Sequence, residues 1–376
     1  MNNWKKCKLG DIAEILNNKR IPLNTMQRQK MKGEYPYYGA SGIIDYVNDY
    51  LFDGEYVLIS EDGENLKSRK TPIAFKASGK FWVNNHAHII KGKMDFQNDL
   101  IVYIFKNIDL NPYLTGAVQP KLNKENLLDI DFYLPPLEEQ RQIAAILSSI
   151  DDKIELLHEQ NKTLEKLAQT LFRHYFIENP NPSWQEKPLS DFGNIICGKT
   201  PSKNVDEYYN GDIPFIKIPD MHGNIFVFKT NECLSELGSQ TQINKLIPKK
   251  SICVSCIATV GMVSMNAFES HTNQQINSIV PKKEHYRYFL YLYMKHLYDY
   301  LQSMASGGTA TANLNTRDFS NIHILMPDEE MMINFNGKTS EYFDKIFKNL
   351  EQIQTLENMR DILIPKLLNG EIKINN

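Results

Sequence analysis

The sequence predicts an α/β (α+β) protein in which two similar domains alternate with two long helices. A chain of 376 residues is longer than one hydrophobic core usually organises. The sequence also aligns with itself, and two stretches carry apolar residues at helical spacing. We therefore expect domains over residues 1–136 and 179–327, followed by helices over 137–178 and 328–376.

The internal repeat is visible as paired residues at a nearly constant offset. The offset is 180 at the start of each domain and 192 from the end of each domain onward, as expected if insertions lie in loops. The clearest pairs are Trp4 and Trp184, Leu9 and Leu189, Leu122-Asn123 and Leu314-Asn315, and Pro135 and Pro327. A register held over so long a stretch argues against chance similarity.

Within the domains, short β-rich runs predict strands. Tyr56–Ile59 and Ile252–Ser255 consist mostly of residues that favour strands. The apolar runs Leu100–Phe105 and Tyr288–Tyr293 are compatible with either helix or strand. Each domain is therefore expected to be mixed, with an irregular sheet.

The first long helix is expected to begin after Pro135-Pro136, because Glu138-Glu139 places negative charge in a first helical turn. A seven-residue apolar spacing predicts a coiled-coil seam. Its members are Ile143, Ile150, Leu157, Leu164 and Leu171 in the first helix, and Phe343, Ile346, Leu350, Ile353, Leu356 and Leu363 in the second. Pro365 and Gly370 are expected to end the second helix. The polar residues expected within the seam, where they would weaken it and fix register, are Lys153, Gln160, Asn349 and Gln352.

The apolar stripe of the second helix needs a partner, and the nearest is the first helix. If the two helices pack antiparallel, the C-terminus returns to the first domain. The expected molecule is pseudo-two-fold and circular, with its domains separated by a long antiparallel two-helix coiled coil.

Three parts of the chain resemble a known family. Gly116–Asn123 followed by Leu134–Leu147 resembles the junction and first helix of type I restriction–modification specificity subunits. Leu363–Ile372 resembles the C-terminal ending of that family, and Trp184–Pro201 the start of its recognition domains. The second copy departs from the pattern at Met326–Glu330, which lacks the second proline and the glutamine.

The resemblance implies a non-catalytic DNA-binding subunit without a cofactor. Each target-recognition domain would read one half of a bipartite site on double-stranded DNA, and the spacer helices would fix the gap. The implied protein partners are two adenine methyltransferase subunits and, in the full complex, motor-nuclease subunits.

The side chains expected to contact DNA are Arg and Lys, which suit phosphate and guanine, and Asn and Gln, which suit adenine. The candidates in the first domain are Lys19, Arg20, Lys67, Arg69, Lys70, Asn84, Asn85, His86 and Lys121. Those in the second domain are Lys199, Lys203, Asn273, Gln274, Gln275 and Arg317. The basic run from Lys67 to Lys70 is equally compatible with a solvated surface turn, and the amide clusters with local backbone bonding.

Two other classes of function are compatible with parts of the sequence. Gly193–Thr200 matches the phosphate-binding loop of nucleotide hydrolases, but polar residues precede it and Pro201 follows. A coiled-coil adaptor that binds only proteins is the other alternative. Cys253 and Cys256 have metal-like spacing, but strand alternation would point the two thiols to opposite faces, which favours buried core cysteines.

Composition limits the class of protein. No apolar run approaches the length of a membrane span, and five scattered cysteines do not suggest a disulfide framework, so a cytoplasmic protein without a membrane partner is expected. Net charge is +2 over residues 1–136 and +1 over 179–327, but −3 over each helical stretch. The domains rather than the helices are therefore expected to meet DNA, with modest affinity for the chain alone.

Overall fold

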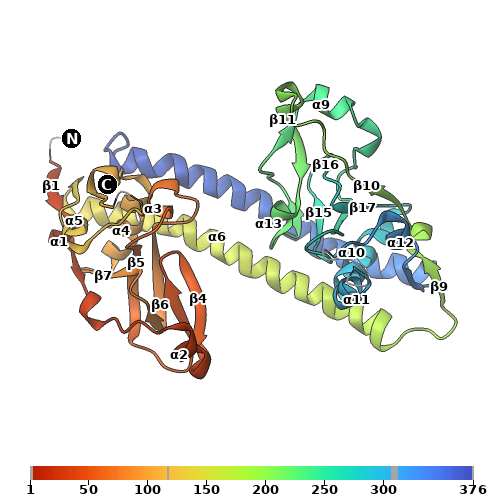
Figure 1. The fold of residues 1–376 in the computed structure, drawn as a ribbon, viewed down its shortest axis with the longest axis horizontal. Helices are drawn as coiled ribbons and strands as arrows, with labels where there is room; N and C mark the ends of the chain where they lie inside the picture. Colours follow the sequence, from red (N-terminus) through yellow and green to blue (C-terminus); the bar gives the residue numbers. More distant parts are fainter. Residues whose placement is uncertain (1–2, 117, 306–311, 375–376) are drawn as a thin grey trace. The chain divides into compact units, whose positions relative to one another are not determined.

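The computed structural model describes residues 3–116, 118–305 and 312–374, and it contains two compact units (Figure 1). The first unit holds residues 1–156 and 352–376, and the second holds residues 157–351. Each unit combines one mixed domain with segments of both long helices. The predicted fold class is confirmed.

The first domain is built on a six-stranded sheet with the strand order β2-β7-β5-β6-β3-β4. Its strands are β2 (Ala13–Ile15), β3 (Lys32–Gly39), β4 (Gly42–Val47), β5 (Phe52–Ser60), β6 (Ala74–Val83) and β7 (Ala87–Gly92), and a separate pair joins β1 (Lys5–Lys8) to β8 (Asp131–Leu134). Its helices are α1 (Leu9–Ile12), α2 (Thr25–Lys30), α3 (Asn65–Ser68), α4 (Phe96–Asn107) and α5 (Lys124–Leu128). The run Leu100–Phe105 is thus helical, and its apolar side chains are buried against the sheet.

The second domain has a five-stranded sheet with the order β10-β17-β14-β15-β12, a three-stranded sheet β13-β11-β16, and the pair β18-β9. The strands are β9 (Gln185–Pro188), β10 (Gly193–Cys197), β11 (Tyr209–Ile216), β12 (Phe226–Val227), β13 (Cys233–Leu234), β14 (Ile252–Ser255), β15 (Val263–Asn266), β16 (His271–Thr272), β17 (Ile276–Pro281) and β18 (His323–Met326). The helices are α7 (Leu189–Phe192), α8 (Ile218–Met221), α9 (Glu236–Gln240), α10 (Arg287–His296), α11 (Tyr298–Ala305) and α12 (Thr316–Ser320). The run Tyr288–Tyr293 is helical here too.

The two domains repeat one plan, down to single hydrogen bonds. Strand β7 lies between β2 and β5 in the first domain, as β17 lies between β10 and β14 in the second, and all four pairings are antiparallel. The repeated leucines Leu122 and Leu314 are buried. The Leu122 N–H donates to the carbonyl of Glu61, which follows β5, and the Leu314 N–H donates to the carbonyl of Cys256, which follows β14, both at 2.8 Å. The asparagine that follows each leucine caps the next short helix. The repeated Leu-Asn pair is therefore a core anchor followed by a helix cap.

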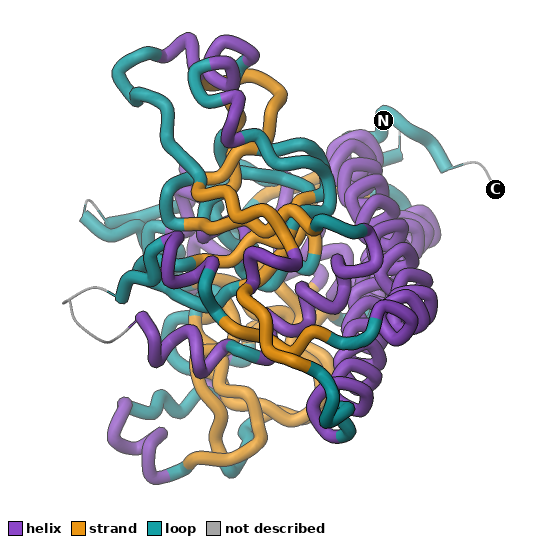
Figure 2. Tube along the Cα trace, turned by 90° about the vertical axis from the view of Figure 1, so that its right-hand side faces the viewer, coloured by secondary structure: helices purple, strands orange, loops and turns teal. Residues whose placement is uncertain are grey.

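The long helices α6 (Leu137–Phe172) and α13 (Glu329–Leu368) pair antiparallel within each unit. In the first unit the Arg360 guanidinium of α13 donates to the Asp151 carboxylate of α6 at 2.7 Å. In the second unit Asn349 of α13 donates to Asn161 of α6 at 2.8 Å. Residue numbers thus rise along one helix as they fall along the other. Figure 2 shows helices in purple and strands in orange.

All the apolar residues predicted for the helix seam are buried or half-buried. Ile143, Ile150 and Leu157 are nearly inaccessible, whereas Leu164 and Leu171 are only half-buried. Farther along α6 the buried positions shift to Ala168 and Phe172. A straight helix drifts by ~20° per heptad from a strict seven-residue repeat, so the last members of the series rotate toward the flank.

The prediction for the end of α13 is confirmed, but part of the prediction for the seam was wrong. Helix α13 ends at Leu368, between Pro365 and Gly370, and Ile364 and Leu367 on either side of Pro365 are buried in the core of the first unit. Of the polar residues expected in the seam, Lys153 and Gln352 are exposed. Gln160 is exposed too, but it accepts from Asn349 across the helix pair at 3.2 Å, and only Asn349 is buried. Its partner Asn161, which is 5% exposed, interrupts the heptad pattern and was not predicted.

The start and end of the described chain meet within the first unit. The last turn of α13 packs into the same core as Ile130 and Leu134. A Cβ atom on Gly370 would lie 3.2 Å from the Trp4 ring. The second helix therefore returns the chain to the first domain, as the circular arrangement requires.

We expect the buried Asn161–Asn349 pair to cost stability when only one partner is replaced. Asn349→Leu leaves the Asn161 side-chain oxygen buried without its donor, which should lower the free energy of unfolding by about 1–3 kcal/mol. Replacing both residues with leucine removes both polar groups and should recover most of that loss. Urea denaturation measures both variants, and a double variant no more stable than Asn349→Leu would contradict this account.

Candidate nucleic-acid interface

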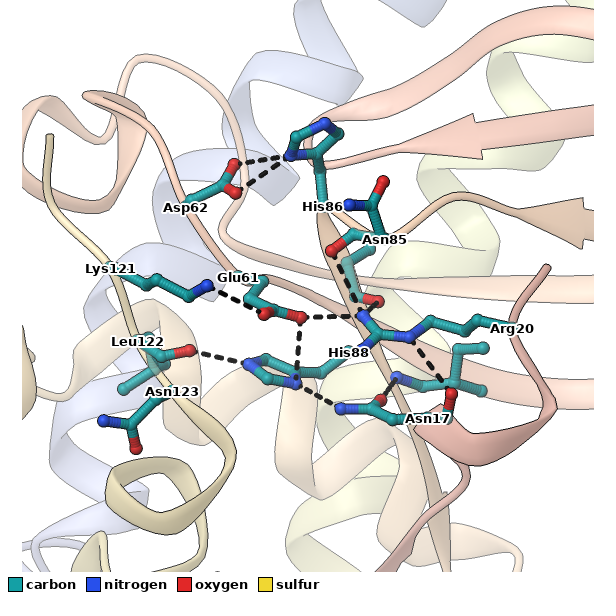
Figure 3. Close-up of polar contacts among 12 residues, drawn as sticks. Asn17, Arg20, Glu61, Asp62, Asn85, His86, His88, Lys121, Leu122 and Asn123 are labelled. Carbon is teal, nitrogen blue, oxygen red and sulfur yellow. Dashed lines mark hydrogen bonds and ion pairs between the residues drawn. The ribbon is translucent and has the colours of Figure 1, made fainter. Parts of the chain in front are cut away.

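Four loops converge at one edge of the first domain (Figure 3). They are residues 17–20 after β2, 61–63 after β5, the turn 84–86 between β6 and β7, and residues 119–123 before α5. Backbone bonds join them, from Glu61 N to the His86 carbonyl at 2.9 Å and from Gly63 N to the Pro120 carbonyl at 3.0 Å. Six of the nine first-domain candidates lie on these loops: Lys19, Arg20, Asn84, Asn85, His86 and Lys121.

Arg20 ties three of these loops together. Its side chain is only 15% exposed, and its guanidinium donates to the Glu61 carboxylate at 2.7 Å. It also donates to the carbonyls of Ala87 at 2.8 Å and Asn85 at 3.3 Å. Burial opposes ionisation of Glu61, but the bond from Arg20 and the nearby positive charges prevail and lower the pKa of this carboxyl. Arg20 is therefore occupied in holding loops, with little of its guanidinium free for a ligand.

His88 lies beneath this ion pair and is buried. Its Nε2 lies 2.7 Å from the Leu122 carbonyl, which requires a proton on Nε2, and its Nδ1 accepts from the Asn17 amide at 2.7 Å. Burial lowers the pKa of His88, against the opposing effects of the Leu122 carbonyl and Glu61. The ring is therefore neutral near pH 7, and a second proton on Nδ1 would displace the Asn17 contact.

The other candidates of the first domain differ in the exposure of their side chains and in whether those side chains already have a polar partner. Asn84 is 7% exposed, and its side-chain oxygen accepts from His86 N at 2.8 Å. The His86 ring pairs with Asp62 at 2.9 Å, and Lys121 lies 3.4 Å from Glu61. Lys19 and Asn85 are exposed, and their side chains have no partner among the described residues.

In the basic run from Lys67 to Lys70, one basic side chain is bonded to described residues of the domain and two are not. Lys67 and Lys70 are exposed, but Arg69 donates to the carbonyls of Phe105, Lys106 and Ile108. Arg69 thus satisfies carbonyls at the C-terminal end of α4, where positive charge is favoured. The turn is held to the domain by this residue, and only the two lysines project from it.

In the second domain three of the six candidates, Asn273, Gln274 and Gln275, form the turn between β16 and β17. Asn273 is 7% exposed and its oxygen accepts from Gln275 N at 3.1 Å, while its amide donates to the Gln275 side chain at 2.9 Å. Gln274 is exposed, and its Oε1 accepts from the Thr200 hydroxyl at 2.6 Å. Lys203 pairs with Glu232 at 2.8 Å. Lys199 and Arg317 are exposed.

Sequence reasoning missed the residues that organise the first site, which are Glu61, His88 and Asn17. The matched backbone bonds place Cys256 and Asn277 of the second domain where Glu61 and His88 lie in the first. Charge at this position is therefore present in one copy and absent from the other. The charged network lies in the loops, where the two halves of the sequence diverge most.

The nucleotide-hydrolase alternative does not fit the structure of Gly193–Thr200. Gly193 to Cys197 form strand β10, paired along its length with β17, and no helix follows Thr200 directly. Gly198 packs so closely on the Thr272 and Asn273 carbonyls that a Cβ would lie 2.3 Å or less from both. The segment is a sheet strand rather than a loop that could cradle phosphates.

The remaining chemistry is equally limited. Cys253 and Cys256 are buried in different core clusters, as strand alternation predicts. Among residues 3–116, 118–305 and 312–374, no group of three histidine, cysteine or acidic side chains is placed to hold a metal ion. No helix in these ranges is long and apolar enough to cross a bilayer.

We expect His88 to make the stability of the first domain depend on pH. Because its pKa is lowered in the folded protein, the unfolded chain binds the proton more readily, and stability falls as pH drops below the ordinary value of about 6.5. The loss should approach about 1 kcal/mol per pH unit. His88→Asn inserts the residue found at the matching place in the second domain. Thermal unfolding at pH 7.5 and 5.5 should show a smaller acid-induced loss in this variant than in the wild type, and an equal loss would be inconsistent with a neutral buried His88.

Both domains match known proteins. Residues 1–166 and 181–359 match the family model described as type I restriction modification DNA specificity domain. The specificity subunit of the type I restriction enzyme HindI from Haemophilus influenzae is 33% identical, over 99% of this chain and all of that relative. The MjaIX specificity subunit of Methanocaldococcus jannaschii is 25% identical, over 99% of this chain and 94% of that relative.

A solved structure shares the fold. The crystal structure of a type I restriction–modification S subunit from M. genitalium superposes with a TM-score of 0.63 at 14% identity, covering 99% of this chain and 97% of that one. The family model matches each half of the chain separately, as the internal repeat and the two similar sheets require. The chain belongs to the family of type I restriction–modification specificity subunits.

Proposed function

We propose that this protein reads a bipartite DNA site for a type I restriction–modification complex, with one half-site read by each domain. The observation that carries the proposal is the duplication of one fold, with a cluster of amide and cationic side chains on matching loops of both copies. The loop sequences of the two copies differ, so their half-sites should differ and the whole site should be asymmetric.

The side chains on these loops suit both parts of DNA recognition. Phosphates fix the position of a protein on the duplex, and the exposed cations Lys19, Lys70, Lys199 and Arg317 are available for them. Base edges specify sequence, and the exposed amides of Asn85 and Gln274 have the required donors and acceptors. The small positive charge of each domain fits modest affinity for the chain alone, with partner subunits supplying the rest.

The helix pair is proposed to set the gap between half-sites. Helix α6 spans 36 residues without interruption, equivalent to about 54 Å. Its register with α13 is fixed by Asp151–Arg360 in the first unit and by Asn161–Asn349 in the second. A pair locked at two points resists sliding, as a spacer of constant length must.

The outer faces of these helices are proposed to dock two adenine methyltransferase subunits. Apolar side chains that face solvent rather than the seam occur on both helices, and a docked subunit would bury them. They are Ile146, Leu156 and Leu167 on α6, and Ile333, Met359 and Ile362 on α13. Motor-nuclease subunits would join this assembly for cleavage. In this proposal catalysis resides in the partners, and the chain itself supplies specificity.

Exchanging residues 1–134 for the matching domain of a relative should change one half-site only. Each domain has its own core and its own loop cluster, so the second domain should keep its contacts. Mapping methylated adenines in cells that carry the hybrid chain and its methyltransferase reads both half-sites directly. If both half-sites changed together, independent reading by the two domains would be refuted.

A paired insertion in the helices should widen the gap while leaving both half-sites intact. Four residues inserted after Leu156 in α6 and after Glu351 in α13 add about one turn, or ~6 Å, to both helices. This is close to two base pairs at ~3.4 Å per step. Asp151–Arg360 lies on one side of the two insertions and Asn161–Asn349 on the other. Both helices lengthen equally between these contacts, so each contact keeps its register.

The control for the paired insertion is the same four residues in α6 alone. This single insertion moves the Asp151–Arg360 contact out of register with Asn161–Asn349 and should lower thermal stability. Methylated-site mapping of the paired variant should show a gap longer by one or two base pairs. An active paired variant with an unchanged gap would show that the partner subunits, not these helices, set the spacing.

A further inference from the structure

The turn that carries Asn85 has a counterpart in the second domain, with the same internal bonding. In both domains a buried asparagine opens the turn, and its side-chain oxygen accepts the N–H of the third residue. The carbonyl of that third residue accepts a second backbone N–H, from Glu61 at 2.9 Å in the first domain and from Cys256 at 2.7 Å in the second. Asn85 and Gln274 are therefore equivalent residues, each at the middle of its turn.

The middle residue of each turn is exposed, and its side chain takes no part in the bonding within the turn. The flanking asparagines, Asn84 and Asn273, are 7% exposed, and their oxygens are used inside the turn. In the third position His86 is paired with Asp62, and Gln275 accepts from Asn273. In Figure 3 the dashed contact to Asn85 ends on its backbone carbonyl, and none ends on its amide.

Residues at equivalent positions of the repeat, Arg20 and Thr200, hydrogen-bond to the middle residue of the turn in each domain. Arg20 donates to the Asn85 carbonyl at 3.3 Å, and Thr200, its counterpart at the offset of 180, donates to the Gln274 side chain at 2.6 Å. One residue earlier the repeat places Lys19 and Lys199, both exposed. In each domain an exposed lysine thus precedes, by one residue, the side chain that contacts the middle of the turn.

We propose that Asn85 and Gln274 are the matched base-reading residues of the two domains, and that Arg20 and Thr200 are their positioning residues. This inference rests on the proposed function and narrows it to one side chain per half-site. The Asn85 amide is unpartnered and can use both its donor and its acceptor, which suits the edge of adenine. Thr200 occupies the Gln274 oxygen, so Gln274 presents its NH₂ group to an acceptor such as purine N7, guanine O6 or thymine O4.

The test uses the chain assembled with its methyltransferase subunits and maps methylated sites for Asn85→Ala and Gln274→Ala. Each variant should lose discrimination at one base pair, by about 5- to 150-fold, and only within the half-site of its own domain. Gln29→Ala and Asn194→Ala serve as controls, because they remove exposed polar side chains from the same two domains away from the turns. Both controls should keep the wild-type motif.

Positioning by Thr200 has a separate readout. Thr200→Val should weaken discrimination at the same base pair as Gln274→Ala, and the double variant should resemble Gln274→Ala alone. Thr200→Ser, which keeps the hydroxyl, should restore the wild-type motif. A structural role for Thr200 would instead lower stability without selecting one base pair.

Every outcome bears on the inference. If a variant abolishes methylation, competition binding with oligonucleotides substituted at single positions takes its place, and equal weakening on all sequences would overturn base reading by that residue. A variant that keeps the complete wild-type motif would overturn it as well. Failure of the proposed function looks different, because the wild-type complex would then methylate no bipartite motif at all.

Discussion

The antiparallel pairing of α6 with α13 is the constraint on which the rest of the structure depends. Each helix carries an apolar stripe that cannot be left in water, and each buries it partly against the other helix and partly against the domains. Because α13 runs back along α6, its last turns enter the core of the first unit, next to the start of the chain. The Asp151–Arg360 and Asn161–Asn349 contacts then select one register from the several that apolar packing alone would allow.

The paired helices connect two copies of one domain whose loops differ. Two copies of a small mixed domain share a common sheet order and the same Leu-Asn anchor, yet their loops hold different chemistry. Where the first copy has the Arg20–Glu61 ion pair over a neutral His88, the second has Thr200, Cys256 and Asn277. The conserved framework thus presents equivalent turns, and the variable loops supply different contacts. In the proposed function, this difference lets one chain read two unlike half-sites.

The sequence predicted the repeat, the two helices and their seam, because hydrophobic periodicity and matched residues depend on local spacing. It did not predict the buried Asn161, because a polar residue at a seam position interrupts the apolar spacing on which the prediction rests. Nor did it separate free from occupied candidates: Arg20 and Arg69 resemble DNA contacts in sequence, but both bind carbonyls of neighbouring loops. Which cation is free depends on contacts between residues far apart in the chain, and no local pattern encodes those contacts.

The central claim is that each copy of the domain reads its own half of one DNA site, with the helix pair between them. Sequencing that detects methylated adenine across the genome of a host carrying this chain and its methyltransferase tests it most directly. The account predicts one asymmetric motif of two short specified segments, separated by a fixed number of unspecified base pairs. A single contiguous motif, or two specified segments at variable separation, would contradict it.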